Sequence, residues 1–226
     1  MTFSIAARCP GTGMFGCAVT SSSPAVAARC AHAEAGVGAV LSQNVTDPTL
    51  GPRGLALMAR GATAAEAVAI LARAAPHMAH RQLIAVDRHG GTAIHTGAAA
   101  LGVLGEAAGE NAAAAGNLLT DPGVPAAILA GFHATTGPLG DRLLAALAAG
   151  RDAGGEAGPV RSAGLRLVRE AAFPVADLRV DWTAEGVCPI AELQSIWAVY
   201  APQLEDYVTR ALNPESAPGY GVPGDP

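Results

Sequence analysis

The stretch Thr2-Phe-Ser-Ile-Ala-Ala-Arg-Cys-Pro-Gly-Thr-Gly-Met-Phe-Gly-Cys-Ala-Val-Thr-Ser-Ser-Ser23 decides the fold. Residues 2–7 alternate weakly between apolar and polar side chains, and residues 15–20 form a second, mostly apolar run. Pro, Gly and Thr at 10–13 supply turn chemistry between the two runs. The pattern predicts a hairpin whose first strand begins at residue 2. The hydroxyl run at 20–23 then ends the second strand beside that first residue.

Further elements follow outward from this hairpin. Apolar runs and turn signals predict strands over 36–41, 82–87, 92–96, 162–168 and 177–180. Helical spacing and capping signals predict helices over 55–60, from the capping box Thr63–Glu66, from Asp121, from Pro138 to Gly150, and over 193–208. Gly61 occupies the position after the first of these helices, where a left-handed residue is common. Residues 98–116 are rich in Ala and Gly without a clear period, so no element is predicted there.

The order of these elements favours one class of fold. Strands come in paired blocks that are separated by paired helices, which is typical of a layered α+β sandwich rather than of βαβ alternation. We expect one domain over residues 1–212, followed by a Pro- and Gly-rich tail over 213–226 that lacks regular structure.

Composition excludes several functions. The formal net charge is -5, and the sequence contains Arg but no Lys, which excludes a Walker lysine and a Schiff-base lysine. No basic run points to nucleic acid, and no apolar run is long enough for a membrane span. The four cysteines form no CxxC pair and no secretion signal is apparent, so we expect a cytoplasmic protein with reduced thiols.

Three motifs have plain explanations. The GxGxxG matches at 11–16 and 219–224 do not join a strand to a helix, as a dinucleotide site requires. His77 and His80 have the spacing of a metal pair but lack a third nearby ligand, which favours a surface turn. Cys9 and Cys17 fit small buried residues on adjacent strands, although a cysteine nucleophile stays a third hypothesis. We therefore expect no metal and no cofactor.

The start Met1-Thr2 suggests a specific chemistry. Methionine before a small residue is readily removed, which would leave Thr2 with a free α-amine. That amine has a reference pKa of about 7.7–8.0, so it can act as the base for the hydroxyl of its own residue. Many cytosolic proteins begin in this way, so the start alone is weak. The serine run that the hairpin places beside Thr2 strengthens the hypothesis, although this run also fits an ordinary polar turn.

The chain resembles, over nearly its whole length, a bacterial family called domain of unknown function 1028, which is assigned to the N-terminal-nucleophile (Ntn) hydrolase superfamily. The resemblance rests on eight segments taken together, namely 1–5, 18–21, 35–40, 51–55, 81–83, 95–97, 116–119 and 162–163. It implies a four-layer αββα sandwich, hydrolysis of an amide bond, and Thr2 at the position of the nucleophile. Ser21 is the closest counterpart of the polar residue that ends the second strand in superfamily relatives.

The sequence departs from the family pattern at some positions. Ser22 replaces a basic residue, Asp47 stands where asparagine is common, and Ala115 replaces a glutamine. The catalytic lysine of proteasome-type relatives has no counterpart.

The hypothesis that follows is an amidohydrolase acting on a small amide or ureide through a Thr2 acyl-enzyme. Asn117 is the first candidate for the oxyanion donor and Asn44 the second. Arg81 either binds a substrate carboxylate or forms a salt bridge at a strand edge. His95 either transfers a proton or has a structural role. Ser22 is expected on the substrate side of the site.

The alternative from another class is a non-catalytic protein that uses the sandwich as a ligand-binding or oligomeric scaffold. Ser22 in place of a basic residue and retention of Met1 would both favour it. For partners, we expect a small-molecule amide substrate, no nucleic acid, no membrane and a homo-oligomer.

Overall fold

A computed structural model describes residues 1–223 and contains two antiparallel sheets with helices packed against them, so the predicted α+β class is confirmed. The larger sheet has six strands in the order β10-β9-β2-β1-β8-β7. Its strands are β1 (Thr2–Arg8), β2 (Phe15–Ser21), β7 (Gly105–Gly109), β8 (Ala112–Asn117), β9 (Ser162–Val168) and β10 (Ala176–Val180). The predicted hairpin forms its centre, because β1 pairs with β2 on one side and with β8 on the other.

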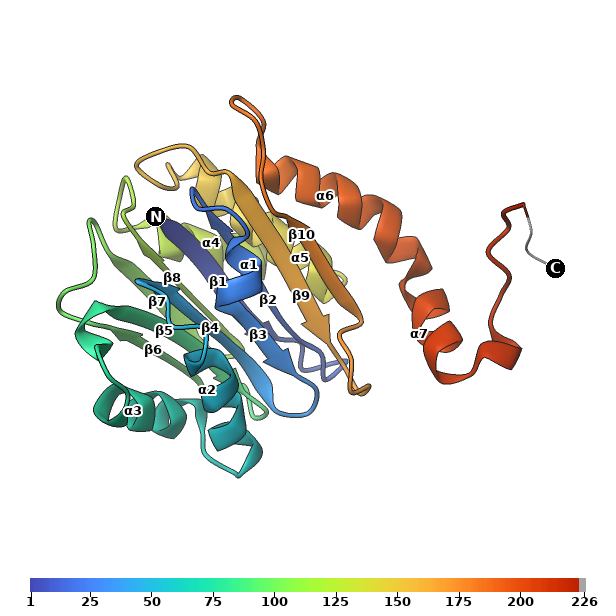
Figure 1. Ribbon diagram of the computed structural model, residues 1–226, viewed down its shortest axis with the longest axis horizontal. Coiled ribbons are helices and arrows are strands. Elements are labelled where there is room, and N and C mark those ends of the chain that lie inside the picture. The colour runs from blue at the N-terminus through green and yellow to red at the C-terminus, as the bar shows by residue number, and fades with distance from the viewer. Residues whose placement is uncertain (224–226) are drawn as a thin grey trace.

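The smaller sheet has four strands in the order β3-β4-β5-β6. These are β3 (Ala31–Glu34), β4 (Gly38–Asn44), β5 (Arg81–Asp87) and β6 (Thr92–Thr96). One apolar cluster joins the two sheets face to face, with Ala6 and Cys17 from the larger sheet against Leu41, Ile84 and Val86 from the smaller. Figure 1 shows this stacking, with the N-terminus at one end of the space between the sheets.

Helices cover the outer face of each sheet (Figure 1). α4 (Val124–Ala134) and α5 (Leu139–Asp152) pack on the larger sheet, while α2 (Leu50–Ala59) and α3 (Ala64–Ala74) pack on the smaller. Side-chain alternation along β1 explains the packing. Phe3, Ile5 and Ala7 lie in the cluster that faces α4 and α5. The alternate residues of β1 therefore face the second sheet, and Thr2 is one of them.

Several expected elements are confirmed, with small differences at their ends. The capping box of α3 forms as predicted, since Thr63 Oγ1 accepts from the Glu66 amide and the Glu66 carboxylate accepts from the Thr63 amide. Gly61 follows α2 with φ +101°. The hairpin predicted over 82–87 and 92–96 is β5 and β6.

The expectation that residues 98–116 hold no element is wrong, because β7 and most of β8 lie there. Alanine at 112–115 gives no alternation to detect, yet each of these alanines is fully buried, and they alternate between the apolar clusters on the two faces of the sheet. Short elements α1 (Val26–Cys30) and β3 were also missed. The helix expected over 193–208 divides into α6 (Pro189–Tyr200) and α7 (Leu204–Leu212), because Pro202 interrupts it.

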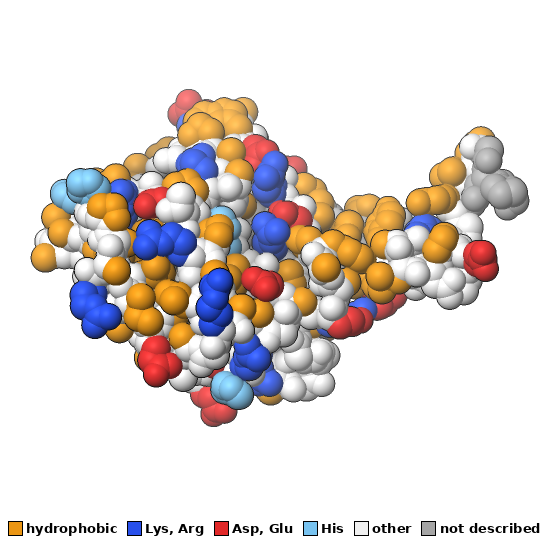
Figure 2. All heavy atoms as spheres, turned by 60° about the horizontal axis from the view of Figure 1, so that its bottom comes forward, with side chains coloured by type: hydrophobic (Ala, Val, Ile, Leu, Met, Phe, Trp, Pro, Cys, Tyr) orange, Lys and Arg blue, Asp and Glu red, His pale blue; other side chains and the backbone are white. Residues whose placement is uncertain are grey.

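The C-terminal helices leave the body of the molecule. α6 packs against β9, β10 and α5, whereas α7 and residues 213–223 project from the body (Figure 1). Figure 2 shows hydrophobic side chains along this projecting part, in which Leu212 and Tyr220 are more than half exposed, as is Val199 near the end of α6. The expected irregular tail holds one short 3-10 turn at Pro214–Ser216, and residues 224–226 of that tail lie outside the described residues. Among the described residues, no helix has both the length and the apolar character to span a bilayer.

Candidate active site

Thr2 lies at the mouth of the space between the two sheets. In the larger sheet it pairs with Ser21 of β2 and with Asn117 of β8, and Ser21 in turn pairs with Ser162 of β9. Paired residues of antiparallel strands share a sheet face, so these four polar side chains form one row across four strands. The row faces the smaller sheet, and every member is buried.

Hydroxyl groups converge on the carbonyl group of Met1. The Thr2 Oγ1 lies 2.5 Å from Met1 O and 3.2 Å from Ser21 Oγ. Ser21 Oγ donates to the same Met1 carbonyl at 2.5 Å and accepts from the Ser23 amide at 3.1 Å. A hydroxyl carries one proton, so Thr2 can donate to only one of its two neighbours at a time. The hydroxyls of two strands are thus fixed around the carbonyl that precedes Thr2.

A chain of buried amides continues from this row into the protein. Ser4 Oγ donates to Gln43 Oε1 at 2.6 Å, and Gln43 Nε2 donates to Gln82 Oε1 at 2.7 Å. Gln82 Nε2 donates to Thr96 Oγ1 at 2.9 Å and to the carbonyl of Gly116 at 3.2 Å. Gln43 and Gln82 are fully buried, so this network joins the two sheets by polar contacts.

Asn117 connects this network to the row of hydroxyls. Its Nδ2 donates to Gln82 Oε1 at 3.1 Å, while its Oδ1 is buried without a hydrogen-bond partner. The residue is fully buried and pairs directly with Thr2. Asn117 is therefore beside Thr2, but the amide hydrogens expected to bind an oxyanion are in part used by Gln82.

Glu156 is a buried carboxyl group near the N-terminus that the sequence did not predict as part of the site. Only 5 % of the residue is exposed, and its Oε2 accepts from the Ser22 amide at 3.1 Å. Its Oε1 is buried without a partner. Burial raises the pKa of this carboxyl to about 8, against the opposing effects of the Met1 α-ammonium and of hydrogen bonds from Ser22. Ser22 thus belongs to the site through its backbone.

Three other candidates lie away from Thr2. On β5, Gln82 and Ile84 face the larger sheet, so Arg81 lies on the opposite, helix-facing side, where its Nη1 donates to the Val45 carbonyl. His95 of β6 pairs with Leu83 on that same side, and its Nε2 lies 3.1 Å from Met78 O. Neither residue is brought to the hydroxyl row.

Asn44 ends β4 in a left-handed conformation, with φ +75°. Both polar atoms of its side chain are buried without a hydrogen-bond partner. It follows Gln43, which faces Ser4, so alternation turns Asn44 toward the helix side. The structure therefore gives it no contact with Thr2.

The cysteines differ in their ability to form a thiolate. Cys17 is fully buried in the apolar cluster between the sheets, and burial raises its pKa to about 12. It therefore stays a thiol at neutral pH. Cys9 follows β1 at the end opposite Thr2. Burial acts to raise its pKa, but hydrogen bonds from Thr12 and Gly11 outweigh it and the pKa is lowered.

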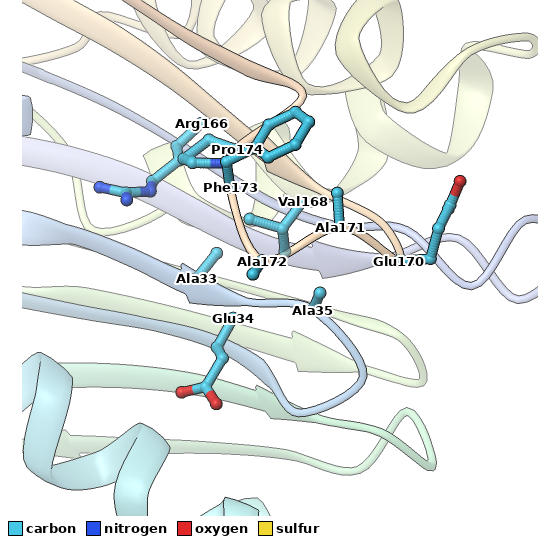
Figure 3. A pocket seen from close by; sticks show the side chains of 10 residues that line it. All are labelled: Ala33, Glu34, Ala35, Arg166, Val168, Glu170, Ala171, Ala172, Phe173 and Pro174. Atoms are coloured by element: carbon cyan, nitrogen blue, oxygen red, sulfur yellow. The ribbon is translucent and has the colours of Figure 1, made fainter. Parts of the chain in front are cut away.

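A cavity of about 420 Å³ lies elsewhere. It opens at the edge of the sheet stack between β3 and the connection from β9 to β10, and its lining includes Glu34 of the smaller sheet and Arg166 of the larger (Figure 3). None of the candidate residues lines it. Within residues 1–223, no three His, Cys, Asp or Glu side chains cluster as metal ligands would.

The fold and this row define an antiparallel α+β protein with a buried polar site at the N-terminal end of its central strand. The chain belongs to the family of unknown function DUF1028, whose sequence model matches residues 2–193. It is also similar to protein SPO2555 from Silicibacter pomeroyi, a crystal structure of the DUF1028 family. The two are 28 % identical with a TM-score of 0.81, over 88 % of this chain and 89 % of that one. No curated protein matches the chain.

Sequence reasoning also missed Gln43 and Gln82 as parts of the site. Both are polar residues at inward positions of strands that are otherwise apolar, which is the signal that would have found them. Glu156 gives no such signal, because it lies in a glycine-rich loop whose course the sequence does not reveal.

Proposed function

We propose that the chain is an Ntn amidohydrolase with Thr2 as its nucleophile, and that its layers form the four-layer αββα sandwich of that superfamily. One observation carries this proposal. Thr2 is the first residue of the central strand, and its hydroxyl is held by Ser21 at the mouth of the space between the sheets. A nucleophile that starts a central strand is fixed by pairing on both sides, which gives the positional precision that catalysis needs.

The reaction uses the two functional groups of one residue. Once Met1 is absent, the Thr2 α-amine accepts the proton of Oγ1 as the oxygen attacks the substrate carbonyl. The amide C–N bond breaks, the leaving amine takes that proton, and an ester forms at Oγ1. Water then attacks the ester, which releases a carboxylic acid and restores the hydroxyl. Ser21 Oγ lies where it can donate to the oxyanion, because it already donates to a carbonyl oxygen there.

A non-catalytic scaffold is the second candidate, and one observation favours it. With Met1 in place, the Thr2 nitrogen is part of a peptide bond and both hydroxyls lie against the Met1 carbonyl. No base is then free on Thr2. N-terminal sequencing and intact mass of the protein separate the two candidates, because the active form must begin at Thr2.

The decisive test is a panel of small amides and ureides with the wild type and Thr2→Ala, each checked for the loss of Met1. We expect turnover by the wild type and a loss of about 10³-fold or more in Thr2→Ala. Thr20→Ala is the matched control. It removes a buried hydroxyl that donates to Ser162 O, one residue from Ser21, and should keep most activity. Equal turnover by wild type and Thr2→Ala would remove Thr2 from the mechanism.

The remaining expectations about partners and location are part of the same proposal. We propose a small-molecule amide as the substrate, a cytoplasmic location, and a homo-oligomer associating through α6 and α7, where Val199 and Leu212 are exposed. Light scattering of the full chain tests the last point, since Val199→Glu should lower the molar mass in solution if these helices form the contact.

A further inference from the structure

Met1 occupies the position that an acyl group would take in the proposed reaction. Its carbonyl oxygen lies 2.5 Å from both Thr2 Oγ1 and Ser21 Oγ. An acyl group on the Thr2 nitrogen and one on the Thr2 oxygen are related through a five-membered ring, so the two positions lie next to each other. The surroundings of Met1 therefore describe the surroundings of the acyl part of a substrate, and this inference rests on the function proposed above.

The slot that holds Met1 has fixed walls. The loop that contains Glu156 is tied to the chain after Asn117 by a bridge between Leu119 and Glu156, and the Ala157 amide donates to Leu118 O at 2.9 Å. Gly158 of this loop lies along the Met1 side chain, because a Cβ at Gly158 would lie 3.0 Å from Met1 Cε and 3.3 Å from Sδ. The slot thus accepts a side chain of methionine size.

Glu156 is the acidic side chain of the slot. Glu156 is 5 % exposed, one of its carboxyl oxygens accepts from the Ser22 amide, and the other has no partner. The positive charge of the Met1 α-ammonium is near enough to act on it. When Met1 leaves, its ammonium leaves with it, and the new α-amine on Thr2 is the neutral base of the proposed reaction. Without a partner, this buried carboxyl holds its proton at neutral pH, and a cationic ligand in the place of the Met1 ammonium would favour the ionised carboxylate and pair with it.

We propose that the acyl part of the substrate is an α-aminoacyl group with a free α-ammonium, which Glu156 binds while Ser21 holds the carbonyl oxygen. The side chain of that group lies along Gly158. In the reaction, the bond between the α-aminoacyl carbonyl and the leaving amine breaks, and an α-aminoacyl ester of Thr2 forms. Hydrolysis of the ester releases a free amino acid. The proposed hydrolase is thus specific for amides of unblocked amino acids.

The test compares L-methionine p-nitroanilide with its N-acetyl derivative, using protein whose first residue is shown to be Thr2. Acetylation removes the positive charge of the α-ammonium and also adds bulk, and Glu156→Gln separates the effect of charge from that of size. We expect kcat/KM for the free amine to exceed that for the acetylated probe by roughly 100-fold, as for loss of one partner of a buried charge pair. In Glu156→Gln, which keeps an oxygen for the Ser22 amide, this ratio should fall to within about tenfold. Glu110→Gln, an exposed substitution at the other end of β8, should leave it unchanged.

A second readout separates this proposal from the function on which it rests. Binding of L-methioninamide and N-acetyl-L-methioninamide to Thr2→Ala can be measured by calorimetry, without turnover. Tight binding of the free amine alone, lost in Glu156→Gln, supports the slot even if no variant hydrolyses an amide. Equal binding of both amides, or equal turnover of both anilides by an enzyme that depends on Thr2, overturns the α-aminoacyl specificity and leaves the nucleophile intact.

Discussion

The two halves of the space between the sheets are built from different chemistry. The half far from the N-terminus is apolar, with Cys17, Ile84 and Val86 in close contact. The half that ends at Thr2 holds Ser4, two buried glutamines and the row of hydroxyls. Apolar burial suffices to hold two sheets together, and a buried polar network adds a desolvation cost without greater stability. The presence of such a network at one end therefore indicates a functional role for that end.

The largest stability effect is expected in the apolar half. Ile84 is fully buried between the sheets, so Ile84→Ala removes apolar contacts and leaves a cavity. We expect the free energy of unfolding to fall by about 2–5 kcal/mol. Urea denaturation measures the loss, and turnover per folded molecule should stay near the wild-type value. A large drop in that turnover would show that the two halves are coupled.

The sequence predicts those parts of the two halves that depend on local patterns, and not those that depend on contacts between distant segments. Thr2 beside Ser21 followed from the hairpin, because alternation and turn residues are local features. Asn117 lies beside Thr2 only through β8, whose alanines carry no period, so its strand was not predicted. Arg81 was expected in the site, but it lies on the helix-facing side, because Gln82 is the residue of that strand that faces inward. Which face is buried follows from packing between sheets distant in sequence.

The next effect concerns the response of the two halves to pH. Burial raises the pKa of Glu156 to about 8, whereas that of Cys17 is raised to about 12, so only the polar half titrates near neutrality. The native state then binds more protons than the unfolded chain between about pH 4.5 and 8. The free energy of unfolding should therefore decrease as pH rises through this window.

Unfolding measured at pH 5 and pH 8.5 tests this direction. Between these values the wild type should lose on the order of a few kcal/mol more than Glu156→Gln, in which this group no longer titrates. Other groups titrate equally in both proteins and cancel in the difference. Parallel pH profiles for the two proteins would mean that Glu156 is ionised in the native state throughout.

The smallest effect tests how tightly the polar half is satisfied. Ser4→Ala converts residue 4 into a copy of Ala6, its neighbour on the same face of β1 in the apolar half. The change removes the donor that lies 2.6 Å from Gln43 Oε1 and leaves that buried oxygen one hydrogen bond short. We expect a loss of about 1–2 kcal/mol in the free energy of unfolding, measured by urea denaturation.

Ser195→Ala is the control for this change, because its exposed hydroxyl only donates to Ala191 O within α6 and should shift stability by less than about 0.5 kcal/mol. A loss for Ser4→Ala well above the control means that no water can replace the hydroxyl, so the network is dry. A dry network holds Gln82, and through it Asn117 beside Thr2, in one arrangement. No loss would instead mean that water reaches Gln43. The polar half would then be a hydrated extension of the site, and its amides would not position Asn117.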